Sequence, residues 1–108
     1  MSTARTLIHL PVTARSGEVV ELRVTIAHPM ETGYRSDNEG RVVPRDILRR
    51  FSCRFEGELV FSAELFPAVA AYPYFAFHLR ATRSGRLAFT WEGDHGFAQT
   101  ETRSLIVG

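Results

Sequence analysis

Apolar and polar residues alternate along several short segments of this sequence. From Glu18 to His28 the apolar residues are Val20, Leu22, Val24 and Ile26, and charged or hydroxyl-bearing residues separate them. A period of two places successive side chains on opposite faces of an extended chain. This segment is therefore predicted to form a β-strand with one buried face and one face in water.

The same alternation recurs in four later segments. Their apolar positions are Phe51, Cys53 and Phe55, then Phe61, Ala63 and Leu65, then Phe75, Phe77 and Leu79, and last Leu87, Phe89 and Trp91. The turn-forming pair Glu56-Gly57 separates the first two segments, and Ser84-Gly85 separates the last two. Each pair is therefore predicted to close a β-hairpin.

Two more strands are expected, near residues 6–10 and over residues 97–107. The last segment has a weak apolar face, which predicts a position near a sheet edge. No segment shows a convincing helical period, so the sequence predicts an all-β fold. We expect an immunoglobulin-like β-sandwich of about seven antiparallel strands. The 108 residues fit one such domain, covering residues 1–108.

Charge and hydropathy exclude several classes of function. The chain carries 13 basic and 12 acidic residues, a formal net charge of +1, which is far from the basic surplus that nucleic-acid binding requires. No stretch approaches the roughly 20 apolar residues of a membrane span. The first ten residues also lack the apolar core of an export signal. We therefore expect no nucleic-acid partner, no membrane span and no signal peptide.

The sequence offers no catalytic constellation. It has no glycine-rich phosphate loop and no Gly-x-Ser-x-Gly motif, and its four histidines are scattered without the close pairing of a zinc site. Cys53, the one cysteine, is in phase with Phe51 and Phe55 and is predicted to be a buried core residue. We expect no enzyme activity, metal or cofactor. A small copper or redox protein built on Cys53, His28 and Met30 is a weaker alternative.

Two segments break the strand pattern and hold the candidate binding residues. In residues 28–35 the candidates are His28, Met30, Glu31, Tyr34 and Arg35, a mixture of side chains that suits a binding surface. In residues 66–75 they are Tyr72 and Tyr74. Residue types alone leave an alternative open for each segment, because Met30 can fill the core and the tyrosines can close one end of the sandwich.

Several strings of residues resemble one known family. They are His-Pro-Met-Glu-Thr-Gly-Tyr-Arg at 28–35, Val-Pro-Arg at 43–45, Val-Phe-Ser-Ala-Glu at 60–64, Phe-Pro-Ala at 66–68 and Asp-His-Gly at 94–96. In this register the chain resembles the Z subunits of the bacterial sulfur-oxidation (Sox) carrier complex, SoxYZ, over nearly its whole length. One departure is Tyr72, where an asparagine is expected before the proline.

The resemblance implies the non-catalytic half of a heterodimer. In this family the partner is a Y subunit, whose flexible Gly-Gly-Cys-Gly-Gly arm carries sulfur intermediates covalently among the periplasmic enzymes of thiosulfate oxidation. This sequence ends Leu-Ile-Val-Gly without such an arm, so we expect the chain to support the Y subunit and help present its cysteine. A periplasmic location is implied in the same way, because the Z subunit is taken to travel with a Y subunit that carries a twin-arginine signal.

The resemblance also suggests what the candidate residues contact. We expect the segments 28–35 and 66–74 to face the Y subunit or, transiently, other Sox enzymes, with Arg35 and Arg45 as anion contacts. The competing interpretation is a generic β-sandwich module that binds a protein or a sugar through its loops. An isolated subunit of such a complex can also form homodimers through an exposed sheet.

Overall fold

The computed structural model describes residues 3–108, which form eight β-strands and one short 3₁₀ helix. The elements are β1 (Thr6–His9), β2 (Thr13–Ala14), β3 (Glu18–Ile26), β4 (Leu48–Phe55), β5 (Glu58–Glu64), β6 (Tyr74–Ala81), β7 (Gly85–Gly93), η1 (Asp94–Gly96) and β8 (Ala98–Val107). The predicted all-β fold is confirmed. Among the described residues, no helix is long and apolar enough to cross a membrane.

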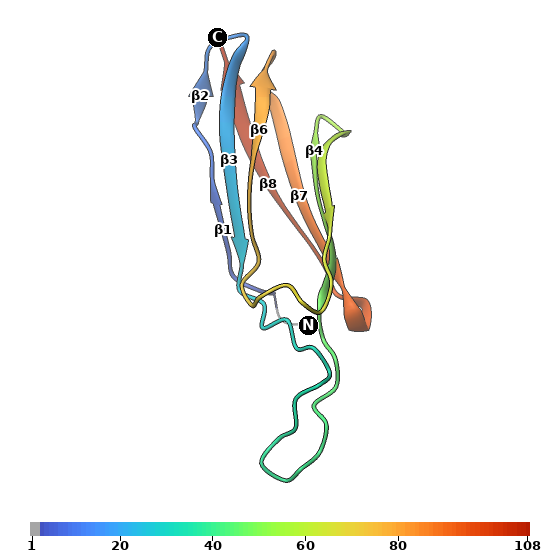
Figure 1. The fold of residues 1–108 in the computed structure, drawn as a ribbon. Helices are drawn as coiled ribbons and strands as arrows, with labels where there is room; N and C mark the ends of the chain where they lie inside the picture. The colour runs from blue at the N-terminus through green and yellow to red at the C-terminus, as the bar shows by residue number, and fades with distance from the viewer. Residues whose placement is uncertain (1–2) are drawn as a thin grey trace.

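The strands form two sheets that pack face to face as a sandwich (Figure 1). One sheet has the order β1-β3-β6 and the other the order β2-β8-β7-β4-β5. All neighbouring strands are antiparallel except β2, which pairs in parallel with the end of β8. The sequence did not predict β2, because its two residues are too few to show a period.

The predicted alternation determines which side chains form the core. In β3 the side chains of Leu22, Val24 and Ile26 are fully buried, whereas Arg23 between them is exposed. The five-stranded sheet contributes its own buried face, whose largest members are the bulky side chains of Trp91, Phe51 and Phe89. Fully burying an aliphatic or Phe side chain stabilises a fold by about 1.5–3 kcal/mol, so these two faces supply the main drive for sandwich formation.

Aromatic rings join the two sheets beside β5 and β6. The ring of Phe61 in β5 stacks on that of Phe77 in β6, with centroids 4.3 Å apart. The ring of Phe51 in β4 stacks on that of Phe75 in β6 at 4.9 Å. Because β4 and β5 belong to one sheet and β6 to the other, these contacts hold the sheets together at this side.

One of the two predicted hairpins is confirmed. β4 and β5 pair through a turn at Glu56-Gly57, whose φ angles of 49° and 83° are the left-handed values that a tight two-residue turn requires.

The other predicted hairpin, at Ser84-Gly85, is wrong. β6 pairs with β3, whereas β7 pairs with β4 and β8, so the chain crosses from one sheet to the other between them. Alternation shows that a strand has one buried face, but it does not show which sheet the strand joins. Gly85 permits the crossing to lie close to β4, because a Cβ there would be 2.7 Å from the Phe55 ring.

The predicted position of the last strand near an edge is confirmed. Within residues 3–108, the two-residue β2 is the one strand that lies beyond β8 in this sheet. The inward side chain of Gln99 is buried, and its amide bonds both the N–H and the C=O of Ala4 at 2.9 Å. The side-chain amide of Gln99 therefore bonds the backbone of Ala4 as a neighbouring strand would. It connects the start of the described chain to β8.

Candidate functional site

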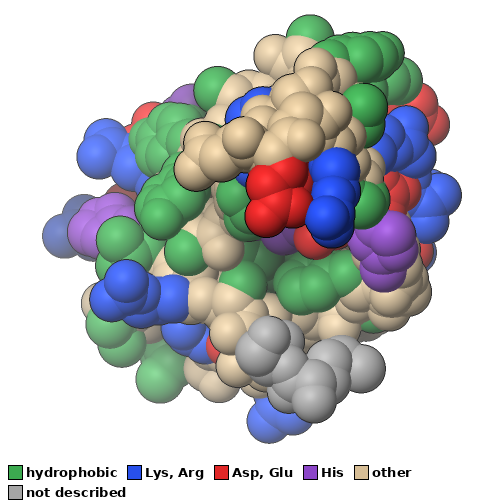
Figure 2. All heavy atoms as spheres, turned by 90° about the horizontal axis from the view of Figure 1, so that it is seen from below, with side chains coloured by type: hydrophobic (Ala, Val, Ile, Leu, Met, Phe, Trp, Pro, Cys, Tyr) green, Lys and Arg blue, Asp and Glu red, His purple; other side chains and the backbone are tan. Residues whose placement is uncertain are grey.

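Three connections meet at one end of the sandwich, which we call the loop end: residues 28–47, 66–73 and 94–96. The longest of them, residues 28–47, projects beyond the sheets as an arm (Figure 1). Figure 2 shows this end face-on, with hydrophobic, acidic, basic and histidine side chains intermixed over it. The loop end is therefore a mixed surface on which no single charge dominates.

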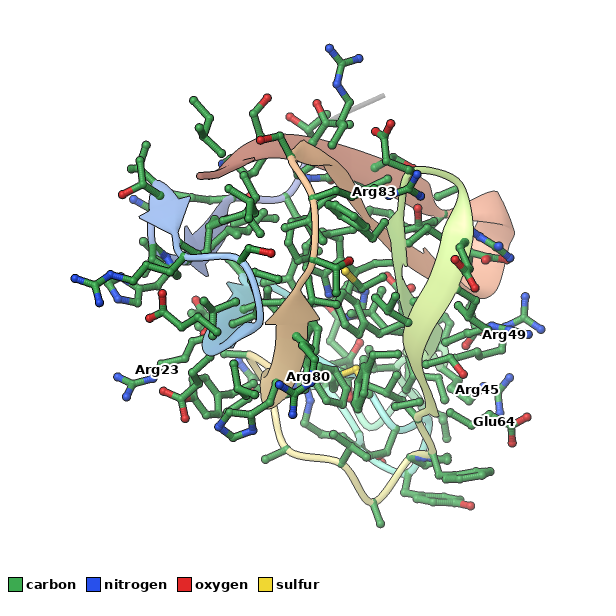
Figure 3. The ribbon with its side chains drawn as sticks, turned by 90° about the horizontal axis from the view of Figure 1, so that it is seen from above. Arg23, Arg45, Arg49, Glu64, Arg80 and Arg83 are labelled. Atoms are coloured by element: carbon green, nitrogen blue, oxygen red, sulfur yellow. The ribbon has the colours of Figure 1, made fainter. Side chains whose placement is uncertain are left out.

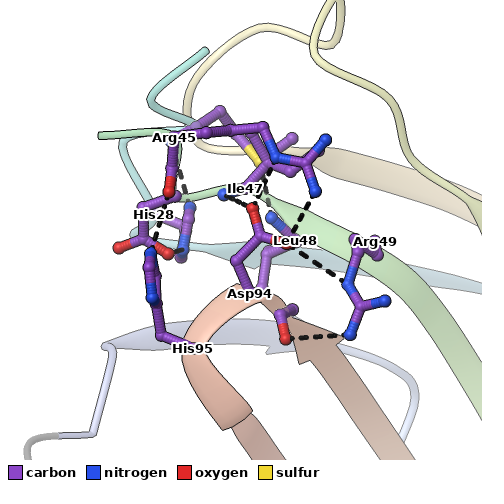
Figure 4. Close-up of polar contacts among 10 residues, drawn as sticks. His28, Arg45, Ile47, Leu48, Arg49, Asp94 and His95 are labelled. Atoms are coloured by element: carbon purple, nitrogen blue, oxygen red, sulfur yellow. Dashed lines mark hydrogen bonds and ion pairs between the residues drawn. The ribbon is translucent and has the colours of Figure 1, made fainter. Parts of the chain in front are cut away.

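Asp94 in η1 links the arm to the β7–β8 connection (Figure 4). Its carboxylate accepts hydrogen bonds from Arg45 Nε and Nη2 at 2.9 and 3.0 Å and from the backbone N–H of Ile47 at 3.1 Å. The Nε of Arg49 lies 3.4 Å from the same carboxylate. These donors hold the pKa of Asp94 below its ordinary value, with the Arg45 hydrogen bond as the largest cause.

Backbone contacts reinforce this link. The N–H of Asp94 donates to the carbonyl of Ile47 at 2.9 Å, and a ring nitrogen of His95 lies 2.9 Å from the carbonyl of Arg45. Gly93 is needed here because a Cβ at this position would lie 2.7 Å from the Ile47 carbonyl oxygen. The base of the arm is therefore held by both side-chain and main-chain bonds.

His28 and Met30 are buried beneath the arm, with 6% and 4% of their surfaces exposed. The Nδ1 of His28 accepts the N–H of Met30 at 3.0 Å, and the Met30 sulfur accepts the N–H of Leu48 at 3.3 Å. The carbonyl of His28 accepts the N–H of Tyr72, which ties the arm to the 66–73 connection. Of the two interpretations left open for Met30, the structure has the one in which it packs into the core.

Burial also shifts the titration of His28. Desolvation lowers its pKa, and this effect outweighs the raising influence of Asp46, whose carboxylate lies 3.8 Å from Nε2, and of Asp94. The hydrogen bond from Met30 requires an unprotonated Nδ1. The geometry at the base of the arm is therefore built around a neutral imidazole.

Ion pairs and a capped turn order the outer part of the arm. Arg35 donates from Nη2 and Nε to the Glu31 carboxylate, at 2.7 Å for the shorter contact. At the tip, Asp37 accepts the N–H groups of Glu39 and Arg41 at 2.9 and 3.0 Å. The arm is therefore a defined loop although it has no core of its own.

Backbone strain concentrates at the loop end. Met30, Tyr72 and His95 have left-handed φ angles of 53°, 57° and 59°. A left-handed conformation costs a residue with a side chain about 1–2 kcal/mol. Such strain persists where surrounding contacts impose it, and it is common at functional sites. Each of the three connections contains one of these residues, which marks the loop end as the candidate functional site.

The exposed aromatic residues of the candidate set lie around this end. Tyr34 on the arm, Tyr72 and Tyr74 are 84%, 62% and 58% exposed. Tyr72 borders a mainly apolar hollow of about 310 Å³ that is also lined by Leu7 and Ala27. Exposed tyrosines, one of them beside an apolar hollow, are typical of a surface that binds another protein.

A second hollow, of about 390 Å³, lies beside β4 and is lined by Arg45, Arg49, Arg50, Glu64 and Phe66, among others. The labelled side chains of Arg45, Arg49 and Glu64 point outward on this side of the sandwich (Figure 3). Arginine and glutamate share this hollow, and Arg45 and Arg49 are already directed at Asp94. It is therefore not a site of concentrated positive charge.

The structure divides the predicted site residues into two groups. Tyr34, Arg35, Arg45, Tyr72 and Tyr74 are exposed, whereas His28 and Met30 support the arm from within and Glu31 is partly buried. Arg35 and Arg45, which are predicted to contact anions, pair with Glu31 and Asp94 within the chain. Their positive charges are therefore neutralised within the chain.

Sequence reasoning missed Asp94, Arg49 and His95 as members of this network. The string Gly93 to Gly96 reads as a solvated turn, which is the usual place for an aspartate. The available signal was that residues 94–96 form one of the strings that resemble the family. The contact between Asp94 and Arg45, 49 residues apart, follows only from the fold.

Cys53 lies within strand β4 rather than in one of these connections. It is fully buried in β4, opposite Phe61 and Phe89 of the neighbouring strands. Burial raises the pKa of its thiol to about 12. A thiol that is neither exposed nor ionised does not act as a nucleophile or carry a group.

Two members of the alternative metal site, His28 and Met30, take part in backbone contacts at the base of the arm. The Nδ1 of His28 and the sulfur of Met30 each accept a backbone N–H. Within residues 3–108, no group of three or more His, Cys, Asp or Glu side chains is placed to hold a metal ion.

Comparison with known proteins identifies a family by sequence. The family described as "Sulphur oxidation protein SoxZ" matches residues 8–104. No curated protein matches the chain.

Solved structures share the fold at low sequence identity. The sulfur carrier protein SoxY from Chlorobium limicola f thiosulfatophilum is 16% identical, with a TM-score of 0.69 over 95% of this chain and 78% of that one. A superoxide reductase (neelaredoxin) from Ignicoccus hospitalis is 17% identical, with a TM-score of 0.73 over 97% and 82%. A putative superoxide reductase from Thermotoga maritima is 17% identical, with a TM-score of 0.73 over 95% and 85%. At such identities these likenesses establish the sandwich fold alone.

Proposed function

Because this chain belongs to the SoxZ family, and is thus a protein of the sulfur-oxidation system, we propose that it is the non-catalytic subunit of a heterodimeric sulfur carrier. Its partner is the Y subunit, which carries the sulfur intermediates of thiosulfate oxidation on a cysteine arm. This chain supports that subunit and helps to present its cysteine to the other enzymes of the system.

The observation that carries the proposal is the family match over residues 8–104. The state of Cys53 supports the assignment of roles within the complex. The sequence has one cysteine, its side chain is fully buried, and its thiol has a pKa of about 12. A sulfur carrier needs an accessible thiolate, so the carrier cysteine belongs to the partner.

The loop end is the surface that we assign to this role. It presents Tyr34, Tyr72 and Tyr74 to solvent, and aromatic residues of this kind dominate the binding energy of many protein interfaces. The network around Asp94 and the buried His28 and Met30 fix the segments that hold these tyrosines. A surface fixed before binding loses less conformational freedom when a partner docks.

The proposed location follows from the proposed partner. The chain works in the periplasm, where the Y subunit of this family functions, and it reaches that compartment together with the Y subunit. Its fold is independent of redox conditions, because a single cysteine forms no internal disulfide.

Size-exclusion chromatography with light scattering, on this chain mixed with the Y subunit of the same organism, tests the proposal. We expect a stable one-to-one complex at micromolar concentration. Replacing Tyr34 and Tyr72 by Ala should weaken it at least tenfold, which corresponds to about 1.4 kcal/mol. Leu59→Ala, an exposed apolar residue next to the Glu56-Gly57 turn, is the matched control and should leave the complex unchanged. Absence of any complex would remove the proposal.

A further inference from the structure

The two sheets have four edges, and three of them carry features that prevent pairing with another strand. β1 is only four residues long. β8 directs Gln99, Glu101 and Arg103 toward the inside of the sandwich, and β2 covers its end. β5 has a register shift in its ladder with β4, where Val60 has no partner between Leu59 and Phe61. Short strands, inward charges and bulges are the usual protections of sheet edges.

β6 has none of these protections. It runs for eight residues, and each of them has a partner in β3 without a register shift. Within residues 3–108, β3 is its one strand partner, so the other side of its backbone is open. Its inward residues Phe75, Phe77 and Leu79 are apolar, and Phe75 and Leu79 remain partly exposed at this side. A regular strand of this kind is a template for strand addition.

The β6 sequence is complementary to itself when paired antiparallel about Phe77. This register sets Phe75 opposite Leu79 of the second copy, Ala76 opposite His78, and Tyr74 opposite Arg80. Apolar side chains then lie opposite apolar side chains. Each Arg80 guanidinium lies opposite a Tyr74 phenol rather than opposite another cation. The two Arg80 side chains lie about 20 Å apart, six strand positions along the ladder, so their repulsion is small.

Other registers are less favourable. If one strand slipped by a single residue, the apolar side chains of one copy would lie opposite the polar side chains of the other. The apolar face of one strand would then no longer continue into that of its neighbour. A register centred on His78 would place the imidazoles of the two copies opposite each other. Centring on Ala76 leaves Leu79 and Arg80 opposite residues that precede β6.

We propose that the open edge of β6 pairs with β6 of a second copy of this chain. The pairing joins two three-stranded sheets into one six-stranded sheet and covers Phe75 and Leu79. It is a property of the isolated chain and does not depend on the proposed function.

Light scattering on the isolated chain and three variants tests this pairing. We expect a dimer at micromolar concentration. Tyr74→Lys sets a lysine opposite Arg80 twice per dimer and should weaken association at least tenfold. Adding Arg80→Glu to Tyr74→Lys converts both contacts into opposite-charge pairs and should restore the dimer. Val60→Lys on the exposed β5 edge is the matched control and should leave the dimer unchanged.

Hydrogen exchange supplies a second measurement that needs no variant. Raising the concentration of the unmodified chain should slow exchange at backbone amides of β6 and leave those of β5 unchanged. A chain that stays monomeric throughout the micromolar range would overturn the proposal. So would a dimer that Val60→Lys disrupts and Tyr74→Lys does not, or a failure of Arg80→Glu to restore association.

Discussion

The carboxylate of Asp94 accepts two hydrogen bonds from the guanidinium of Arg45, at 2.9 and 3.0 Å, across 49 positions of the sequence. This pair joins the base of the arm to the short helix between β7 and β8. The side chain of Asp94 is 12% exposed, whereas that of Arg45 is 48% exposed. The pair is therefore partly open to solvent, which limits its contribution to stability.

Asp94→Asn should lower the free energy of unfolding by about 1 kcal/mol, because the charge-assisted bonds to Arg45 are lost in a half-exposed setting. Urea denaturation measures this change as a lower midpoint with an unchanged slope. Glu39→Gln removes the charge of a more exposed ion pair, with Arg41 on the same arm, and should have no measurable effect. Equal effects of the two substitutions would contradict the role given to Asp94.

The lowered pKa of Asp94 also predicts a dependence on pH. Its contribution to stability is present above the unfolded pKa, near 3.8, and is lost as the pH falls through the lower pKa of the folded state. Asp94→Asn should lack this acid-dependent part. A variant that lost stability as steeply as the unmodified chain over this range would show that Asp94 does not contribute.

His28 should make the chain less stable as the pH falls below about 6.5. Its folded pKa lies below the ordinary value of 6.5, so the unfolded chain binds the proton first and stability declines until the folded pKa is passed. His28→Asn keeps an acceptor for the Met30 N–H without a titrating group and should remove this decline. His78→Asn, at an exposed position on β6, should leave the decline in place. The measurement is the unfolding midpoint between pH 5 and pH 7.5.

Cys53 should resist labelling by a maleimide in the folded chain. Burial raises the pKa of the thiol to about 12, so the thiol is protonated at pH 7, and the side chain has no exposed surface. We expect labelling at least about a thousandfold slower than in denaturant, as followed by mass spectrometry. Equal rates in the two conditions would show that Cys53 is accessible.

Gly33→Ala should disturb the base of the arm beyond its backbone cost. Gly33 has a φ of 89°, and a Cβ there would lie 3.0 Å from the Cβ of Arg45. Gly40 has a similar φ of 79°, but a Cβ there meets nothing within 4 Å. Both substitutions should carry the left-handed cost of about 1–2 kcal/mol locally, and only Gly33→Ala should also weaken binding of the Y subunit. Titration of the Y subunit against the two variants compares them directly.

Much of the fold was predictable because burial is a local signal. The alternation of Val20, Leu22, Val24 and Ile26 predicts both a strand and its buried face, and the structure has both. The sheet that a strand joins is not determined by such a local signal. The connection between β6 and β7 is as short as a hairpin turn, so the crossing between sheets follows from packing that the sequence pattern does not contain.

The candidate site was predictable in part. The unusual composition of residues 28–35 singled out the arm, and Tyr34 and Tyr72 are indeed exposed. Residue type did not distinguish the buried residues that support the arm from the exposed ones. His28 and Met30 were therefore grouped with the exposed candidates. Arg45 was selected as an anion contact without its partner, because Asp94 lies in a turn that is distant in sequence.

The most direct test of the proposed role is the location of the bound sulfur. The complex of this chain with its Y subunit would be incubated with thiosulfate and the partner Sox enzymes, and the intact mass of each subunit would then be measured. We predict sulfur adducts on the Y subunit and an unchanged mass for this chain. A covalent sulfur adduct on Cys53 in the folded complex would contradict the assignment of this chain as the subunit that does not carry sulfur.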